Sequence, residues 1–211
     1  MDGIKIEILF SNRDFAAVVK PVGLLSESGE GGMVSLLEKQ LSKKVYPVHR
    51  LDRAVGGVMI YALSKEGAAA LSKIMESGGF SKEYLAVVHG KCPEEGTMED
   101  LLFKDSRLNK SFVVKRERRG VRKASLEYKR EAFDGEKSLV RIKLHTGRSH
   151  QIRVQFSSRK MPLYGDGKYG GSDNCNIALW SNRISFCMKN EDFVFEKEPP
   201  AVFPFSEFGY N

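Results

Sequence analysis

Most apolar residues of the chain fall in short runs or strict alternations, and both patterns predict β-strands. Apolar and polar residues alternate over residues 4–10, which is typical of a half-buried strand. Continuous apolar runs at 15–19 and 56–63 predict buried strands. Further strands are expected over residues 80–90, 126–132, 139–144, 177–188 and 192–196.

Helical periodicity is rarer than strand periodicity in this chain. Apolar residues at helical spacing predict a short amphipathic helix over 33–42. A second helix is expected over 65–77, with Ser64 as its N-terminal cap and a glycine pair after its end. Ser149 is expected to cap a third, short helix that carries Arg153.

The balance of these elements predicts the fold class. Strands outnumber helices, and tight turns join many neighbours. We therefore expect an α+β fold with a mixed, largely antiparallel central sheet and flanking helices. Residues 91–110 are charged and have no clear period, so we predict irregular structure there. No repeat or interdomain linker stands out, and the length of 211 residues suits a single domain over 1–211.

Composition and charge narrow the classes of protein. Hydrophobic residues make up 41% and charged residues 29% of the chain, which indicates a folded protein. The formal net charge of +7 favours a polyanionic partner, either nucleic acid or an anionic membrane surface. Because no apolar run reaches the length of a membrane span and no signal-peptide core is visible, we expect a cytoplasmic protein without a membrane partner. The sequence does not determine the oligomeric state, and our working expectation is a monomer. The three cysteines form no CxxC pair, which disfavours zinc-ribbon and thioredoxin chemistry.

Asp52 is the strongest candidate for chemistry from the residues alone. It lies between Arg50 and Arg53, and two flanking cations favour an ionised carboxylate with a lowered pKa. Such a group can act as a nucleophile or a base. The following Gly56 and Gly57 leave room for close backbone or ligand approach. The alternative is an ordinary surface ion pair in a turn.

A cluster of positive charge occupies residues 115–123. Its cations are Lys115, Arg116, Arg118, Arg119, Arg122 and Lys123. Such a cluster is either a solvated surface or a loop that contacts RNA phosphates, since lysine and arginine release counterions from RNA. We favour the phosphate-contacting loop.

Five short motifs in one order along the chain resemble those of the RluA-type pseudouridine synthases. Any one of them is a modest match, but together they extend from near the N-terminus to the C-terminal tail. The motifs are Lys20-Pro21-Val22-Gly23, His49-Arg50-Leu51-Asp52, Lys82-Glu83-Tyr84, residues 146–153 (TGRSHQIR) and residues 162–170 (PLYGDGKYG).

The resemblance implies an RNA pseudouridine synthase with the fold of that family. Asp52 would be the essential carboxylate, and it would attack the ribose, add to the base or abstract a sugar proton. Arg153 would pair with that carboxylate, and Tyr84 would stack on the target base and assist proton removal. The nucleotide would leave its stack, and Arg50 would help to hold it. Further substrate contacts are expected from His49, Arg148, His150 and Gln151.

The resemblance also implies the partners. The substrate would be ribosomal or transfer RNA, and the isomerisation requires no cofactor and no metal. The histidines His49, His145 and His150 lack an accompanying carboxylate cluster, which also disfavours a metal site. Because the motifs begin close to the N-terminus, we expect a catalytic domain without an N-terminal S4-type RNA-binding domain.

One departure from the family pattern keeps an alternative open. Val55 and Gly56 stand where the family usually has threonine and serine. The alternative is therefore an RNA-binding protein on the same fold that does not catalyse. An unrelated glycoside-cleaving enzyme is disfavoured because such sites usually need two carboxylates, and only Asp52 stands out.

Overall fold

The computed structural model describes residues 4–29 and 31–210. The chain forms two compact units, which we describe separately. Unit 1 consists of the residues up to Lys82 together with Trp180–Glu198. Unit 2 consists of Glu83–Leu179 and the residues from Pro199 onwards. Of the three crossing points, two fall near the starts of β-strands, after Lys82 and after Leu179, and the third follows Glu198 in a proline-rich stretch.

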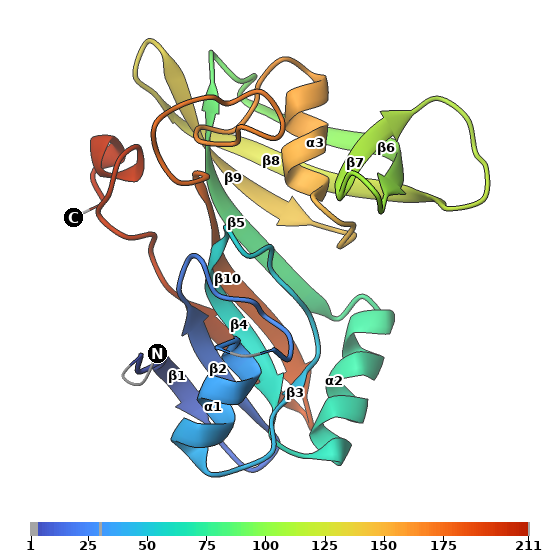
Figure 1. The fold of residues 1–211 in the computed structure, drawn as a ribbon, viewed down its shortest axis with the longest axis vertical. Helices are drawn as coiled ribbons and strands as arrows, with labels where there is room; N and C mark the ends of the chain where they lie inside the picture. The colour runs from blue at the N-terminus through green and yellow to red at the C-terminus, as the bar shows by residue number, and fades with distance from the viewer. Residues whose placement is uncertain (1–3, 30, 211) are drawn as a thin grey trace. The chain divides into compact units, whose positions relative to one another are not determined.

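Unit 1 is built on a twisted sheet (Figure 1). The order of its main strands is β1-β2-β4-β10, with β3 paired to β4 and β11 paired to β10. Pairings are antiparallel except for the parallel pair of β4 and β10. The strand bounds are β1 (Glu7–Ser11), β2 (Phe15–Lys20), β3 (Tyr46–Pro47), β4 (Gly56–Ala62), β10 (Leu179–Met188) and β11 (Glu191–Glu196).

Two helices belong to unit 1, and both were predicted from the periodicity. Helix α1 spans Met33–Leu41, and helix α2 spans Lys65–Glu76. The hydroxyl of Ser64 accepts a hydrogen bond from the backbone N–H of Gly67, so the predicted N-terminal cap is confirmed. Helix α2 packs against β3 and β4.

An aromatic cluster fills the core of unit 1. Phe15 on β2 is fully buried against Phe186, Phe193 and Phe195 from β10 and β11. The ring of Phe80 stacks on Phe186, with ring centroids 5.2 Å apart. Burial of such rings contributes most of the apolar area that stabilises a small unit.

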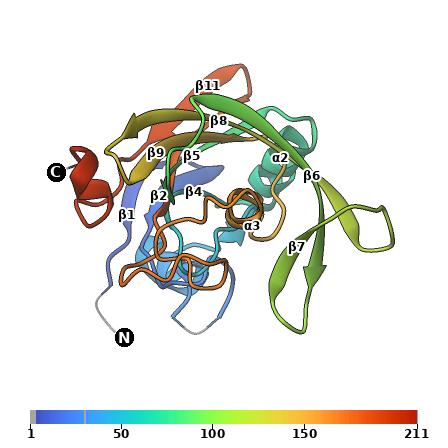
Figure 2. The ribbon, with the colours of Figure 1, turned by 90° about the horizontal axis from the view of Figure 1, so that it is seen from above.

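Unit 2 contains a second set of strands in the order β5-β9-β8-β6-β7. The pairs β6–β7, β6–β8 and β8–β9 are antiparallel. Figure 2 shows helix α3 on the concave side of the curved strands β8, β6 and β7. The elements are β5 (Phe80–His89), β6 (Glu95–Asp105), β7 (Lys110–Val114), β8 (Val121–Phe133), β9 (Lys137–Leu144), α3 (Gln151–Ser158) and a 3₁₀ helix (Phe205–Phe208).

The two faces of these strands differ. On β6, Leu102 points towards α3 and packs with Val154 and Tyr169. Because side chains alternate along a strand, Leu101 and Phe103 point to the opposite face. We call these the inner face and the outer face of unit 2.

Two expectations for unit 2 were wrong in detail. Residues 91–110 are not irregular, because they contain β6 and the start of β7. The residue before α3 is His150, which has a left-handed backbone (φ 53°) and no capping side-chain bond. Ser149 therefore does not cap this helix, and its carbonyl instead accepts a hydrogen bond from Ser111 Oγ at 2.6 Å.

The fold class is confirmed. The strands are mixed and largely antiparallel, and helices flank them, as an α+β fold requires. Within the described residues, none of the helices is long and apolar enough to cross a membrane.

Candidate active site

The loop that carries Asp52 is fastened to the turn after β2 in unit 1. The backbone N–H of Gly23 donates to the carbonyl of Arg53 at 2.8 Å, and Arg53 Nε donates to the carbonyl of Gly23 at 2.9 Å. The backbone N–H of Leu51 donates to Ser26 Oγ at 3.0 Å, and that hydroxyl donates to the carbonyl of Leu51 at 2.8 Å. These reciprocal bonds fix the backbone on both sides of Asp52, whose side chain stays partly exposed.

Lys20 is the buried cation that acts on Asp52. Its ammonium group donates to the carbonyls of Pro21 (2.9 Å), Leu24 (2.8 Å) and Arg53 (3.3 Å). Burial lowers the pKa of Lys20 to about 8, and the opposite charge of Asp52 works against this lowering. Sequence reasoning missed the role of Lys20, although the Lys-Pro-x-Gly motif contained the signal.

The two arginines that flank Asp52 in the sequence have other partners. Arg50 Nη1 lies 3.1 Å from Glu27 Oε1, and both side chains are exposed. Arg53 donates to the carbonyl of Gly23. Arg50 and Arg53 thus contact groups other than Asp52, and the charge of Asp52 acts on the buried Lys20, a residue distant in sequence.

His49 supports the strand that follows Asp52. Its Nε2 accepts a hydrogen bond from the backbone N–H of Ile60 at 3.0 Å, and its ring lies against Phe80 with centroids 5.6 Å apart. Burial, helped by the charge of Lys82, lowers the pKa of His49 to about 3, so the ring is neutral. An accepting Nε2 places the proton on Nδ1. A substrate contact by His49 stays a prediction.

Close packing explains the departure at Gly56. A Cβ atom there would lie 2.5 Å from the Trp180 ring and 3.0 Å from the carbonyl oxygen of Lys20. Gly57 has a φ of +121°, and its Cβ would lie 2.3 Å from the carbonyl oxygen of Ser181. The bulk of Trp180 on β10 therefore occupies the space that a serine at this position would need.

Arg153 is held rigidly in unit 2. It lies on α3 and is 6% exposed. Its Nε and Nη2 each donate to a different oxygen of the fully buried Asp166, both at 2.7 Å. The guanidinium carbon lies 5.2 Å from the ring centroid of Tyr169. Sequence reasoning did not identify Asp166 and Tyr169 as partners, although both belong to the predicted loop 162–170.

The Tyr169 hydroxyl joins α3 to β7. It accepts a hydrogen bond from the backbone N–H of Ser111 at 2.8 Å and donates to the carbonyl of the same residue at 3.2 Å. His150 Nδ1 lies 2.9 Å from this oxygen. We call Arg153, Asp166, Tyr169, His150 and Ser111 the Arg153 cluster.

Gln151 and Arg148 fasten the loop before α3 to β8. Gln151 Oε1 accepts from Thr146 Oγ1 at 2.8 Å and from the backbone N–H of Arg148 at 3.0 Å. Gln151 Nε2 donates to the carbonyl of Ser125 at 3.1 Å, and Arg148 Nε donates to the carbonyl of Lys123 at 2.9 Å. These contacts are internal, and substrate contacts by Arg148, His150 and Gln151 stay predictions.

The structure divides the predicted catalytic residues between the units. Asp52 belongs to unit 1, whereas Tyr84 and Arg153 belong to unit 2. Tyr84 is a buried residue of β5. Its neighbour Glu83 points to the other side of the strand, because successive side chains alternate.

The basic segment 115–123 forms a loop that passes from β7 to the start of β8. Because β7 and β8 pair with opposite edges of β6, this loop crosses β6 and is not a simple hairpin. All six of the predicted phosphate-contacting cations are exposed on it. Lys123 lies 3.6 Å from Glu117, and Arg118 lies over the ring of Phe103.

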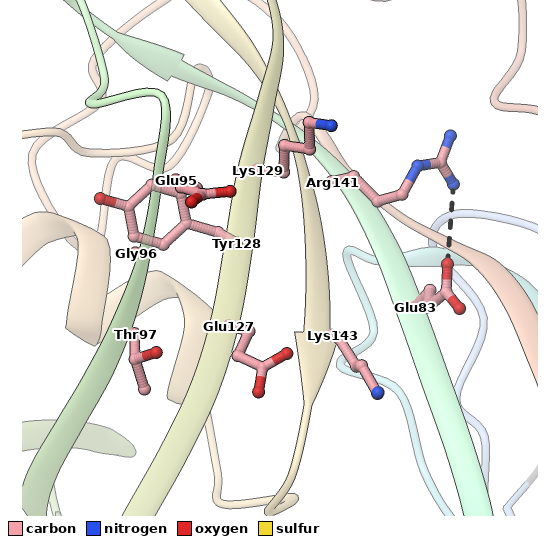
Figure 3. Close-up of a pocket in the computed structure, with 9 residues that line it drawn as sticks. All are labelled: Glu83, Glu95, Gly96, Thr97, Glu127, Tyr128, Lys129, Arg141 and Lys143. Carbon is pink, nitrogen blue, oxygen red and sulfur yellow. Dashed lines mark ion pairs between the residues drawn. The ribbon is translucent and has the colours of Figure 1, made fainter.

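The residues that line a hollow of about 450 Å³ come from neighbouring strands of unit 2, β5, β6, β8 and β9 (Figure 3). None of the predicted site residues lines it. Its lining is Glu83, Glu95, Gly96, Thr97, Glu127, Tyr128, Lys129, Arg141 and Lys143. Acidic and basic residues face one another across the strands, as in the pair Arg141–Glu83 at 3.9 Å. We call this the sheet hollow.

Comparison with known proteins gives one consistent result. Residues 14–158 match the sequence profile of a family described as RNA pseudouridylate synthase. A tRNA pseudouridine synthase C of Pasteurella multocida is 32% identical over 183 residues, covering 78% of this chain and 74% of the relative. A ribosomal large subunit pseudouridine synthase D of Borreliella burgdorferi is 31% identical over 185 residues, covering 81% and 56%.

A structural comparison agrees on the fold. The solved structure of human RNA Pseudouridylate Synthase Domain Containing 4 superposes with a TM-score of 0.81. The match covers 96% of this chain and 92% of that structure, at 21% sequence identity.

Proposed function

Because this chain belongs to the RNA pseudouridylate synthase family and is an RluA-type RNA pseudouridine synthase, we propose that Asp52 is the carboxylate on which its reaction depends. The observation that carries the proposal is the setting of Asp52. Its loop is fastened on both sides, and the buried ammonium group of Lys20 acts on its charge. Such a fixed, electrostatically supported carboxylate suits a catalytic group better than a surface ion pair does.

The reaction replaces the carbon–nitrogen bond between base and ribose with a carbon–carbon bond. The bond between uracil N1 and ribose C1′ breaks, and a bond between C5 and C1′ forms. C5 loses a proton and N1 gains one, so atoms and charges balance without an oxidant. Attack on C1′, addition to the base and removal of a sugar proton each require an ionised carboxylate at this position. The base must leave its stack before any side chain can reach C1′.

Arg153 and Tyr84 complete the proposed catalytic set. Arg153 pairs with Asp52, and the Asp166 carboxylate fixes the direction of its guanidinium group. Tyr84 stacks on the uracil and assists removal of the C5 proton. We propose that residues 1–211 act as a single catalytic domain.

Transfer RNA and ribosomal RNA are the proposed substrates. Relatives of this chain bear names that refer to one or the other. The cations of the basic segment contact RNA phosphates, and Arg50 holds the flipped nucleotide. His49, Arg148, His150 and Gln151 position the loops around that nucleotide through the contacts described above. The enzyme acts as a monomer in the cytoplasm.

The alternative of a non-catalytic RNA-binding protein rested on the departure at Val55 and Gly56. The packing of Trp180 against Gly56 gives that departure a structural reason. It leaves Asp52, Tyr84 and Arg153 in place.

The substrate can be tested with unmodified transfer RNA and ribosomal RNA made by transcription. Each RNA is incubated with the wild type or with Asp52→Asn, and pseudouridine is mapped by primer extension after a pseudouridine-specific chemical reaction. The proposal predicts modification at discrete uridines by the wild type and none by the variant. The absence of pseudouridine from both RNAs would contradict the proposed substrates.

A further inference from the structure

A second hollow lies beside the basic segment, on the outer face of unit 2. Its volume is about 470 Å³. Leu101 of β6 and Val121 of β8 give it an apolar part. The remaining lining residues are Glu117, Arg118, Arg122 and Lys123. We call it the loop hollow.

Arg118 is oriented by an aromatic ring. Its guanidinium carbon lies 4.7 Å from the centroid of the Phe103 ring. The segment turns at Gly120 (φ +88°), where an added Cβ would lie 3.5 Å from that ring. The loop therefore folds against Phe103, and the Arg118 side chain that contacts this ring is exposed to the solvent.

In the part of the chain that the structure describes, the N–H groups of Arg118 have no carboxylate or carbonyl partner. Three arginines of unit 2 that are paired with acids differ in this respect. Arg141 bonds to Glu131, Arg153 to Asp166 and Arg159 to Asp100. Arg118 thus combines contact with an aromatic ring and available donors, and an arginine guanidinium group can stack on an unstacked base.

The charge of the loop hollow also distinguishes it from the sheet hollow. The sheet hollow has three acidic and three basic lining residues. The loop hollow has three basic residues and one acidic residue, and that acid already lies 3.6 Å from Lys123. A ligand with a planar apolar part and a negative charge therefore fits the loop hollow and not the sheet hollow.

We propose that the loop hollow binds one unstacked nucleotide of the RNA, in the region that flanks the target uridine. The base stacks on the Arg118 guanidinium group, which itself rests on Phe103, and its edge contacts Leu101 and Val121. The phosphate group of this nucleotide contacts the cations that line the loop hollow. This inference rests on the proposed function insofar as the ligand is RNA. It goes beyond phosphate contact, because it assigns stacking to a single arginine.

Binding of RNA that cannot react tests the stacking directly. The full chain is titrated into a dye-labelled oligoadenylate of ten nucleotides, which has no uridine, and fluorescence anisotropy is recorded. Arg118→Lys keeps the charge and loses the planar stack. We expect a roughly tenfold weaker binding, since stacking of one base is worth a large part of the affinity for single strands. A blunt RNA duplex should bind the wild type and Arg118→Lys equally.

Lys143→Ala provides the matched control. Lys143 is an exposed cation on the sheet hollow, and like Leu101 it points to the outer face. Its loss should leave oligoadenylate binding unchanged. Arg118 and Lys143 are exposed, so we expect neither substitution to change stability. Equal melting temperatures of the wild type, Arg118→Lys and Lys143→Ala would show that folding is unaffected.

The outcomes separate this inference from the proposed function. Equal oligoadenylate binding by Arg118→Lys and the wild type would overturn the stacking, whatever the catalytic activity. An RNA substrate with flanking single strands should show a raised KM and an unchanged kcat with Arg118→Lys. If the wild type modifies no RNA and Arg118→Lys still binds oligoadenylate tenfold more weakly, the proposed function fails and the nucleotide site stands.

Discussion

Arg153 and Arg118 both lie against an aromatic ring in unit 2, but their surroundings differ. Arg153 is buried, and its guanidinium group is held by both oxygens of Asp166. Arg118 is exposed, and the described residues offer it a ring and no acid. In the first arrangement the carboxylate fixes the direction of the guanidinium group, which suits the proposed catalytic role. The second leaves the donors available, as binding of RNA needs.

The loop of Asp52 in unit 1 follows the pattern of the Arg153 cluster. Its charged residue is supported by a buried partner of opposite charge, Lys20, and its backbone is fixed by reciprocal hydrogen bonds. The difference leads us to expect that the proposed catalytic residues are more fully satisfied by the protein than the proposed RNA-binding arginine.

The largest effect is expected from Asp166→Asn. This change leaves the Arg153 charge buried without its counter-ion, and breaking a buried ion pair costs about 3–5 kcal/mol. We expect a loss of that size in the free energy of unfolding, measured by urea denaturation, together with a loss of turnover. Phe103→Leu beside the exposed Arg118 is the control and should cost far less. Similar stabilities of Asp166→Asn and Phe103→Leu would contradict the contrast between the buried Arg153 and the exposed Arg118.

A second prediction concerns acid and His49. In the folded protein the pKa of His49 is lowered to about 3, so its ring stays neutral above that pH. In the unfolded chain histidine has its ordinary pKa of about 6.5 and binds a proton below that pH. Protonation therefore favours the unfolded state as pH falls from 6.5 towards 3, and roughly 3 kcal/mol of stability should be lost by pH 4.

The measurement is urea denaturation between pH 7 and pH 4 for the wild type and His49→Gln. Glutamine can still accept a bond from the backbone of Ile60 but does not titrate. A pH dependence as steep in His49→Gln as in the wild type would assign the acid sensitivity to other groups.

Gly56→Ala tests the fixed packing behind Asp52. An added Cβ would press on Trp180 and on the backbone of Lys20, and such overpacking costs about 1–3 kcal/mol. The double variant Gly56→Ala with Trp180→Leu should lose less stability than the sum of the two single variants. Simple additivity, measured by thermal unfolding, would show that the two residues do not compete for one space.

The smallest effect on stability is expected from Arg119→Glu in the basic segment. Arg119 is exposed, so the free energy of unfolding should change by no more than about 0.5 kcal/mol. RNA binding should nevertheless weaken, and the slope of log affinity against log salt should fall by about 1. An unchanged slope would indicate that the basic segment is a solvated surface and does not contact RNA phosphates.

The sequence predicted those parts of the fold whose pattern is local. The buried runs of β2 and β4 and the capped helix α2 were visible in their own residues. Strand β6 was not visible, because its outer side carries charged residues and few inner positions are strongly apolar. The left-handed His150 at the start of α3 was equally hidden, since the loop contacts impose it.

The candidate site could be predicted only in part for a related reason. Short motifs marked Asp52, Tyr84 and Arg153, but partners in space come from distant parts of the chain. Lys20 is 32 residues before Asp52, and Asp166 is 13 residues after Arg153. The burial and direction of each side chain decide such pairings, and the spacing of residues along the sequence predicts neither of them.

Release of tritium from RNA labelled at uridine C5 tests the role of Asp52 most directly. Wild type and Asp52→Asn are compared on the same unmodified RNA, after melting curves have shown that both are folded. We expect release by the wild type and none by Asp52→Asn, because C5 loses its hydrogen only when the base is rejoined through that carbon. Release by Asp52→Asn at the wild-type rate would contradict the central role of Asp52.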